Sequence, residues 1–262
     1  MSIKYFEFFG ERCSGTNFLE EAIITNFNVT YKNEGRNKHF FCFNNYDKSY
    51  DNTLFIGIVR NPIYWLNSYH VELHNIPNEN KKNIISFLFN PFYSVDKPDA
   101  TNTKLGTVFT KINFMFNKEY TIKEDLNYIT GDKYKNIFEL RKLKNDYLIN
   151  ILPKKVKNYV LINYEDLLYN YQETLSLIRD KFQLQQKFTP FKKIVRYKKS
   201  THYNFVKQRE ILLPIPIINL IWNNLDIEQE KQLGYIKGDN NNFFINKYKI
   251  NPDDNSKLPI SV

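Results

Sequence analysis

The sequence predicts an α/β fold with three layers, in which helices flank a central parallel sheet. Three observations carry this prediction. Short apolar runs of strand length alternate with stretches of helical periodicity, as in successive βαβ units. The run at 53–59 is continuously apolar after Thr53, which is typical of a parallel strand covered on both faces. At 4–17, a predicted strand, a glycine-containing loop and a predicted helix follow one another directly.

The predicted elements alternate in the order that this fold requires. Leu19, Ala22 and Ile23 give the first helix an apolar stripe, and Asn61 followed by Pro62 is a favourable helix start. We expect strands at 4–9, 28–31, 53–59 and 159–164, and a loop or short strand at 38–43. We expect helices at 14–27, 62–74, near 105–118, near 133–151, and one that opens at Glu165 and carries Leu167, Leu168, Tyr171, Leu175 and Ile178.

The length of the chain predicts a single domain. Its 262 residues can bury one full core, and no internal repeat divides the sequence. The polar stretch 76–104, which contains Pro77, Pro91 and Pro98, is expected to be an insertion over the active face. Residues 240–262 are expected to form a C-terminal tail.

The composition indicates the compartment in which we expect the protein. No run of about 18 or more apolar residues occurs, which excludes a predicted transmembrane helix, and the start of the sequence lacks the pattern of a signal peptide. The two cysteines are too few for a disulfide framework and suit a reducing compartment. We therefore expect a cytoplasmic protein without a membrane partner.

The net charge of +9 favours an anionic partner, either a nucleic acid or a highly phosphorylated small molecule. Lysine and arginine are scattered along the chain rather than gathered in long clusters, which favours a solvated basic surface and no nucleic-acid partner. Richness in Asn, Lys, Ile, Tyr and Phe is typical of an AT-rich genome.

The loop 10–17 has the glycine spacing of a P-loop, G-x-x-x-x-G-K-[ST], and makes the predicted fold P-loop-like. Two positions argue against a nucleoside triphosphate enzyme. Thr16 replaces the lysine that reaches the phosphates, and Asn17 replaces the hydroxyl that binds Mg²⁺. A phosphatase loop, C-x₅-R, also fails because position 19 is leucine, so Cys13 is interpreted as a loop residue and not as a nucleophile.

Sulfuryl transfer from 3′-phosphoadenosine 5′-phosphosulfate needs neither that lysine nor a metal. It needs donors and a cation around the 5′-phosphosulfate, an anion site for the 3′-phosphate, and a base for the acceptor. Four stretches in order resemble the sulfotransferase family: the loop 12–18, Arg60-Asn61-Pro62 with Ser68 eight residues after the arginine, Tyr164-Glu165-Asp166-Leu167, and 225–235 ending in Leu-Gly-Tyr.

The resemblance implies roles for individual residues. Cofactor-binding positions at the 5′-phosphosulfate are Arg12, Cys13, Ser14, Gly15, Thr16, Asn17 and Phe18. Arg60 and Ser68 are expected to bind the 3′-phosphate, with Lys198 and Lys199 as further contacts. Phe18 and Tyr164 are candidates for packing on adenine, against the alternative that both are core residues. The chain departs from the family pattern at Cys13, where a basic residue is expected, and at 196–201, which lacks the glycine of an R-K-G loop.

The catalytic residues implied are Arg12 and His39. Arg12 would neutralise the bridging oxygen as the sulfuryl group leaves. His39 would take the proton of the acceptor, a role that a near-neutral pKa suits. Glu20 and Glu21 are the alternative bases.

His70 and His74 lie a turn apart on one predicted helix, a spacing that could suggest metal ligation. Without an evident Cys or carboxylate partner they are interpreted as ordinary helix residues, so no metal is expected.

The sequence therefore predicts an enzyme: a metal-independent sulfotransferase that transfers the sulfuryl group in line to a hydroxyl or amine of a small-molecule or carbohydrate acceptor. The product would be adenosine 3′,5′-bisphosphate. A P-loop nucleotide kinase and a basic nucleic-acid-binding protein are the alternatives.

Overall fold

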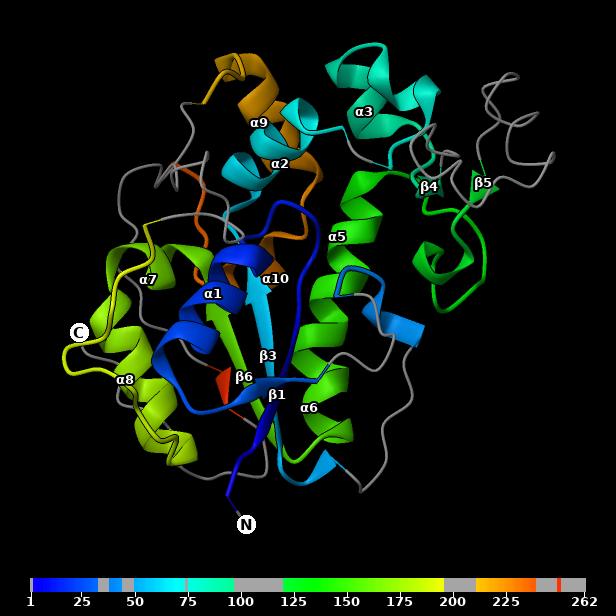
Figure 1. Cartoon of the computed structure of the whole chain (residues 1–262). Helices are drawn as coiled ribbons and strands as arrows, with labels where there is room; N and C mark the ends of the chain where they lie inside the picture. The colour runs from blue at the N-terminus through cyan, green and yellow to red at the C-terminus, as the bar shows by residue number, and fades with distance from the viewer. Residues whose placement is uncertain are drawn as a thin grey trace, which may run out of the picture. The chain divides into compact units, whose positions relative to one another are not determined.

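The structure, a computed structural model, describes residues 2–32, 38–43, 50–73, 75–96, 120–195, 211–238 and 249–250. Figure 1 shows the elements of the whole chain, and their contacts divide the chain into two compact units. The first comprises Met1–Tyr69 with Lys144–Val262, and the second comprises His70–Leu143. The described part of the expected insertion at 76–104 falls in the second unit. The single domain stays a prediction, and the expected tail at 240–262 lies outside the described residues except for 249–250.

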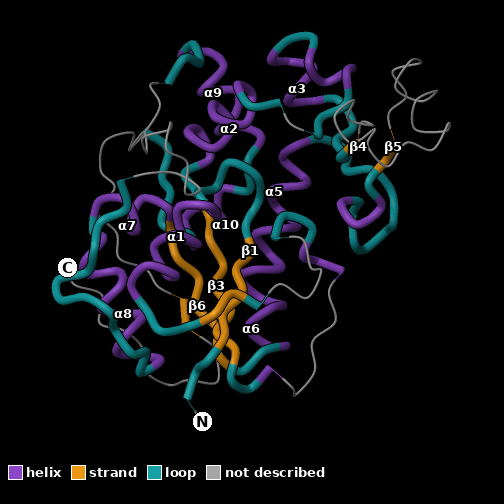
Figure 2. Tube along the Cα trace, viewed as in Figure 1, coloured by secondary structure: helices purple, strands orange, loops and turns teal. Residues whose placement is uncertain are grey.

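The first unit is built on a five-stranded sheet with the order β2-β1-β3-β6-β7. Its strands are β1 Tyr5–Phe9, β2 Thr30–Tyr31, β3 Thr53–Val59, β6 Asn158–Asn163 and β7 Lys249–Ile250. The first four strands in this order are parallel, and β7 is antiparallel to β6. The predicted α/β class with a central parallel sheet is confirmed (Figure 2).

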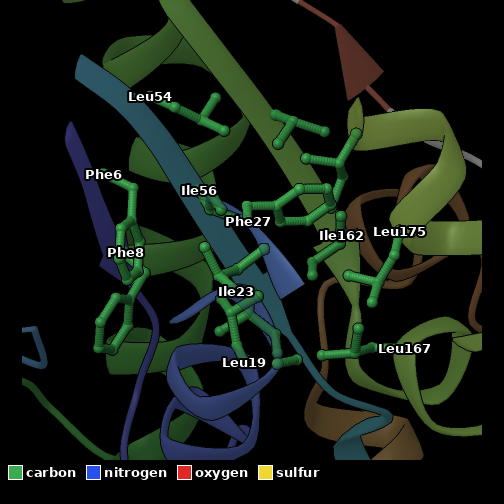
Figure 3. Packing of buried hydrophobic residues seen from close by; sticks show 14 of the residues in the cluster. Phe6, Phe8, Leu19, Ile23, Phe27, Leu54, Ile56, Ile162, Leu167 and Leu175 are labelled. Carbon is green, nitrogen blue, oxygen red and sulfur yellow. The ribbon is translucent and has the colours of Figure 1, made fainter. Parts of the chain in front are cut away.

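One face of this sheet packs on α1 (Thr16–Asn26) and α8 (Tyr171–Phe182). Alternate residues of a strand point to the same face of the sheet. On this face, the central strands β1, β3 and β6 carry aromatic and branched side chains. The cluster includes Phe6, Phe8, Leu54, Ile56, Val160 and Ile162 from the sheet, with Leu19, Ile23, Leu175 and Ile178 from the helices (Figure 3). Burial of these side chains holds α1 against the strand that precedes it.

The opposite face carries the other alternate residues and is covered by the segment 147–155. The rings of Phe9 and Phe55 stack with centroids 6.2 Å apart, and Phe41 packs between Phe9 and Tyr147. The hydroxyl of Tyr159 donates to the carbonyl of Leu148 at 2.7 Å. This second covered face completes the three layers.

The C-terminal end of α1 is fastened to a later segment of the chain. The amide of Asn26 donates to the carbonyl of Lys192 at 3.1 Å, and its Oδ1 accepts from the N–H of Lys192 at 2.7 Å. The N–H of Asn28 also donates to the carbonyl of Gln185 at 2.9 Å. Both ends of α1 are thus held, one by the sheet loop and one by 185–192.

The helix after β3 begins as the sequence predicts. It is α2, Pro62–Val71, and Asn61 caps it, because Oδ1 of Asn61 accepts from the N–H of Ile63 at 3.0 Å and of Tyr64 at 3.4 Å. The helix ends earlier than expected, and His74 lies outside the described residues.

Other predictions need correction. The single helix expected from Glu165 is two helices, α7 (Tyr164–Tyr169) and α8, because Asn170 leaves the helical region with φ −112° and ψ 46°. Its N–H closes α7 on the carbonyl of Asp166 at 2.9 Å, and its own carbonyl accepts from Thr174 at 2.8 Å. The helix expected near 133–151 starts later, as α5 (Ile137–Asp146), and continues through a π-helical turn, Tyr147–Ile151, into α6 (Leu152–Lys155).

The first unit also contains a short 3-10 turn and two later helices. The stretch expected as a loop or short strand at 38–43 contains a 3-10 turn, η1 Phe41–Phe43, and the helix expected near 105–118 lies outside the described residues. Two further helices of the first unit are α9 Ile215–Asn224 and α10 Ile227–Gln232. No helix in the described ranges is both long and apolar enough to span a membrane.

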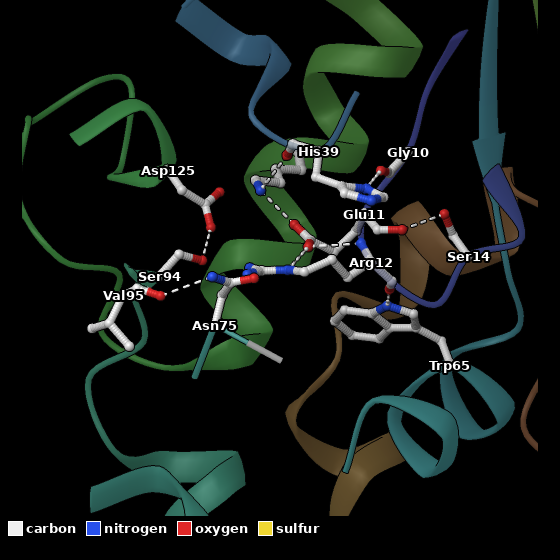
Figure 4. A network of polar contacts seen from close by, with 11 residues as sticks. Gly10, Glu11, Arg12, Ser14, His39, Trp65, Asn75, Ser94, Val95 and Asp125 are labelled. Atoms are coloured by element: carbon white, nitrogen blue, oxygen red, sulfur yellow. Dashed lines mark hydrogen bonds and ion pairs between the residues drawn. The ribbon is translucent and has the colours of Figure 1, made fainter. Parts of the chain in front are cut away.

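The second unit has its own small elements. They are η3 Asn78–Lys81, α3 Ile84–Phe89, β4 Val95–Asp96, β5 Tyr120–Thr121 and η5 Lys123–Asp125, with β4 and β5 antiparallel. The buried hydroxyl of Ser94 donates to the carboxylate of Asp125, and the amide of Asn75 donates to the carbonyl of Val95 at 3.0 Å (Figure 4). These bonds tie the start of this unit to its short strands.

Candidate functional site

The strand order reverses at β1, which places a ligand crevice at a known position in such sheets. The chain puts β2 on one side of β1 and β3 on the other. In open α/β sheets, ligands bind beyond the carboxyl ends of the strands at this switch point. The loop 10–15 follows β1 and Arg60-Asn61 follows β3, so both predicted anion-binding stretches meet there.

The loop after β1 depends on its glycines. Gly15 has φ 96°, and a Cβ added to it would lie 2.2 Å from a ring atom of Tyr164. A Cβ on Gly10 would lie 2.6 Å from the carbonyl of Ile58. Cys13 also has a positive φ of 64°, and the turn is closed by Ser14, whose N–H and Oγ donate to the carbonyl of Glu11 at 3.1 and 2.5 Å. The loop therefore passes close under Tyr164.

The loop leads into α1, and the N-terminus of this helix has no side-chain cap. Gly15 is the N-cap residue and has no side chain to accept from the first turn. The first N–H groups of any helix lack acceptors within the helix, and the helix dipole favours negative charge at that end. The start of α1, which holds Thr16 and Asn17, therefore suits an anion.

Arg60 joins the loop after β1 to α2. Its Nη1 donates to the carbonyl of Cys13 at 2.9 Å and to Oγ of Ser68 at 3.1 Å. Its guanidinium carbon lies 4.7 Å from the ring centroid of Tyr164. The side chains of Arg60 and Ser68 are buried. These contacts thus bring together Cys13, Arg60, Ser68 and Tyr164, from three of the stretches that the sequence singles out.

Arg12 makes a different set of contacts (Figure 4). Its Nε donates to Oε1 of Glu11 at 3.0 Å, and its guanidinium lies 5.2 Å from the ring centroid of Tyr69. The indole N–H of Trp65 donates to the carbonyl of Arg12 at 2.8 Å. Arg12 is buried in these protein contacts, and its role at the bridging oxygen stays a prediction.

Glu11 is the centre of a buried charge cluster that the sequence did not reveal. Nζ of Lys144 donates to Oε2 of Glu11 and, at 2.9 Å, to the carbonyl of His39. Burial alone would raise the pKa of the Glu11 carboxyl, but the positive charges of Lys144 and Arg12 outweigh it and lower the pKa to about 2. Glu11 is therefore ionised at neutral pH.

His39 lies beside this cluster, with Nδ1 2.8 Å from the carbonyl of Gly10. Burial disfavours the charged ring and lowers the pKa of His39 to about 3, although the charge of Glu11 opposes this shift. The near-neutral pKa expected from the sequence is wrong for this environment. His39 is a neutral imidazole at neutral pH and a weak base.

A further cation, Lys38, lies at the start of α1. Its Nζ donates to Oδ1 of Asn17 and lies 3.6 Å from Oε2 of Glu20. Lys38 stands directly before His39 at a predicted strand end, but the sequence alone predicts no binding role for it. Glu21 follows on the same helix and is partly exposed.

Phe18 and Tyr164 both belong to the hydrophobic core cluster, and each is 5% exposed. Their rings meet edge on, with centroids 6.2 Å apart. Core packing accounts for both side chains, and the packing on adenine stays a prediction. Lys198 and Lys199 lie outside the described residues.

Of the two histidines expected on the second helix, only His70 belongs to the described residues. His70 packs its ring on Phe87 with centroids 5.3 Å apart, and burial lowers its pKa. In the described ranges, no group of three or more His, Cys, Asp or Glu side chains is arranged to bind a metal.

Two predicted motifs meet behind the site. Oε1 of Glu165 accepts from the N–H of Asn61 at 3.0 Å, and Oε2 accepts from the hydroxyl of Tyr235 at 3.0 Å. The amide of Asn163 donates to the carbonyl of Leu233 at 2.8 Å. Burial raises the pKa of Glu165, although these bonds and the charge of Arg60 oppose the rise. Hydrogen bonds thus join the Tyr-Glu-Asp stretch to the Leu-Gly-Tyr stretch.

Comparisons of the chain with protein-family models, curated proteins and solved structures find no match. The site therefore has to be interpreted from its own chemistry.

Proposed function

We propose that the protein is a sulfotransferase that uses 3′-phosphoadenosine 5′-phosphosulfate as the donor. The observation that carries the proposal is the Arg60–Ser68 pair beside the uncapped start of α1. These are two anion sites at one switch point, as a nucleotide with separate 5′ and 3′ anionic groups requires. The acceptor would be a hydroxyl or amine of a small molecule or carbohydrate.

The donor set fits this nucleotide. Backbone N–H groups at the start of α1, with the hydroxyl of Thr16, would hold the 5′ group, and the planar fork of Arg60 with the hydroxyl of Ser68 would hold the 3′-phosphate. Lys38 adds a positive charge at Asn17. When bound, the nucleotide supplies the sulfuryl group, and the N–H groups in the uncapped first turn of α1 would face the developing charge.

One observation keeps the nucleotide kinase as a second candidate. Lys38 brings a cation to the helix start where Thr16 replaces the P-loop lysine. A kinase needs Mg²⁺ to bind its triphosphate productively, whereas sulfuryl transfer does not. Dependence on metal therefore separates the two functions.

The first test is thermal stabilisation of the wild-type protein by adenosine 3′,5′-bisphosphate in EDTA. A ligand at about 100 times its Kd is expected to raise the Tm by about 5 to 10 °C. Ser68→Ala is expected to reduce this shift, because it removes one hydroxyl from the proposed 3′-phosphate site. No shift with this ligand, together with a shift from Mg-ATP, would instead support a kinase. Salt-sensitive binding of DNA or RNA alone would support the third alternative.

A second test assigns the base. His39→Ala is expected to lower kcat by up to about 100-fold, the lower end for general bases, because a base with a pKa of about 3 removes a proton poorly. The affinity for adenosine 3′,5′-bisphosphate should be retained. Turnover can be followed as release of adenosine 3′,5′-bisphosphate with an aliphatic alcohol as the acceptor probe, because that hydroxyl does not titrate near pH 6.5. Because the pKa of His39 is about 3, the rate should show no acid limb near pH 6.5. If His39→Ala keeps its turnover and Glu20→Gln or Glu21→Gln loses it, the base is that carboxylate.

A further inference from the structure

The carboxylate of Glu165 connects three separate parts of the first unit. One oxygen accepts from the N–H of Asn61, which follows β3, and the other accepts from the hydroxyl of Tyr235, which follows α10. Glu165 itself stands in the first turn of α7 and is 2% exposed. A buried carboxylate bonded on both oxygens is held in one place, because loss of either bond would leave a buried charge poorly satisfied.

The bond to Asn61 controls the turn that presents the candidate 3′-phosphate site. Asn61 follows Arg60 directly in the chain, and its side chain caps α2 through Ile63. Seven residues further along the chain, the same helix carries Ser68, whose Oγ lies 3.1 Å from Nη1 of Arg60. The peptide that Glu165 holds therefore lies between the two side chains that form the site.

The hydroxyl of Tyr235 is itself fixed by its surroundings. The N–H of Tyr235 donates to the carbonyl of Glu230 at 2.9 Å, and the carbonyl of Leu233 accepts from the amide of Asn163 at 2.8 Å. Gly234 between them has φ 89°, a left-handed conformation that suits glycine. Tyr235 is 5% exposed, so its hydroxyl approaches Glu165 from a rigid, buried segment.

We propose that Glu165 and Tyr235 are a pair of positioning residues that set Arg60 and Ser68 for a ligand with a 3′-phosphate. This inference rests on the proposed function and assigns a role that neither residue has there. The pair acts through the peptide of Asn61. Its effect is therefore confined to the ligand group that Arg60 and Ser68 bind.

Tyr235→Phe tests the pair with the loss of one hydroxyl. The Kd of adenosine 3′,5′-bisphosphate is expected to rise about 3- to 10-fold, in line with the net contribution of one typical hydrogen bond. The Kd of adenosine 5′-monophosphate, which lacks the 3′-phosphate, should change less than about 2-fold. Titration calorimetry measures both constants. A general structural defect would weaken the two nucleotides alike, so the ratio of the constants distinguishes positioning from loosened packing.

Tyr159→Phe is the matched control. Tyr159 is also buried and donates its hydroxyl to a carbonyl, that of Leu148, on the covered face of the sheet. This variant should leave both constants near those of the wild type. At Glu165, the variant Glu165→Gln retains an acceptor for Asn61 and a donor for the tyrosine oxygen, so it should bind the bisphosphate more tightly than Glu165→Ala.

The outcomes distinguish failure of the proposed function from failure of the positioning role alone. If the wild type binds the bisphosphate no better than the monophosphate, the proposed function fails and the pair has no such role. If the wild type prefers the bisphosphate and Tyr235→Phe keeps that preference unchanged, the positioning role alone is overturned. Should Glu165→Ala fail to fold, the result of Tyr235→Phe still decides.

Discussion

We expect Arg60→Ala to lower the affinity for adenosine 3′,5′-bisphosphate about 100-fold and to reduce the thermal shift at the same ligand concentration to about 1 °C. The guanidinium is buried and lies against Ser68, the ring of Tyr164 and the carbonyl of Cys13. A charged donor in such a place contributes more to phosphate binding than it would in water, at about 1.5 to 3 kcal/mol per hydrogen bond. Calorimetric titration without Mg²⁺ measures the loss.

Two variants make this result specific. Arg60→Lys keeps the charge but not the planar fork, so its affinity should lie between those of the wild type and Arg60→Ala. Arg179→Ala removes an arginine near the end of α8, where it pairs with Asp180 at 2.6 Å, and should bind like the wild type. An affinity of Arg60→Ala within about threefold of the wild type would place the 3′-phosphate elsewhere.

We expect Lys144→Met to destabilise the protein by about 3 kcal/mol in urea unfolding at pH 7. The side chain of Lys144 is 4% exposed and pairs with Glu11, whose side chain is 9% exposed. Removal of one partner of a buried ion pair leaves the other charge poorly compensated, at a cost of about 3 to 5 kcal/mol. Arg12 still faces Glu11 in this variant, which favours the lower value.

The exposed pair Lys231–Glu228 provides the control. Its atoms are 2.8 Å apart, but its side chains are 52% and 83% exposed. Lys231→Met should therefore change the stability by less than about 1 kcal/mol. A similar loss from both variants would show that the Glu11 cluster is not special, and the double variant Glu11→Gln with Lys144→Met should recover part of the loss.

Acid unfolding follows from the same cluster. The pKa of Glu11 is lowered in the fold from 4.5 to about 2, so its stabilisation is complete above pH 4.5 and is lost as the pH falls toward 2. The pKa of His39 is lowered from 6.5 to about 3, so the unfolded chain binds this proton first and stability also falls below pH 6.5. Both groups therefore destabilise the fold in acid.

The sheet and its helices could be predicted because each depends on local patterns. The buried residues Phe6 and Phe8 of β1 and the continuous apolar run of β3 follow directly from the residue order. The expected helix from Glu165 was wrong because its apolar residues keep helical spacing through Asn170. Spacing alone does not show that the Asn170 peptide changes direction.

Part of the candidate site could be predicted from local sequence, and part of it could not. Arg60 and Ser68 could be paired in advance, because a fixed spacing of eight residues across a helix start places both on one side. The Glu11–Lys144 pair could not, since 133 residues separate its members and only the fold brings them together. The pKa of His39 was missed for the same reason, because burial depends on distant segments.

The bonds between Asn26 and Lys192 fix the chain at 192 to the C-terminal end of α1. The 11 residues of α1 extend about 16 Å, and the loop 10–15 enters this helix at its other end. The segment 185–192 therefore braces α1 from the end opposite the candidate site.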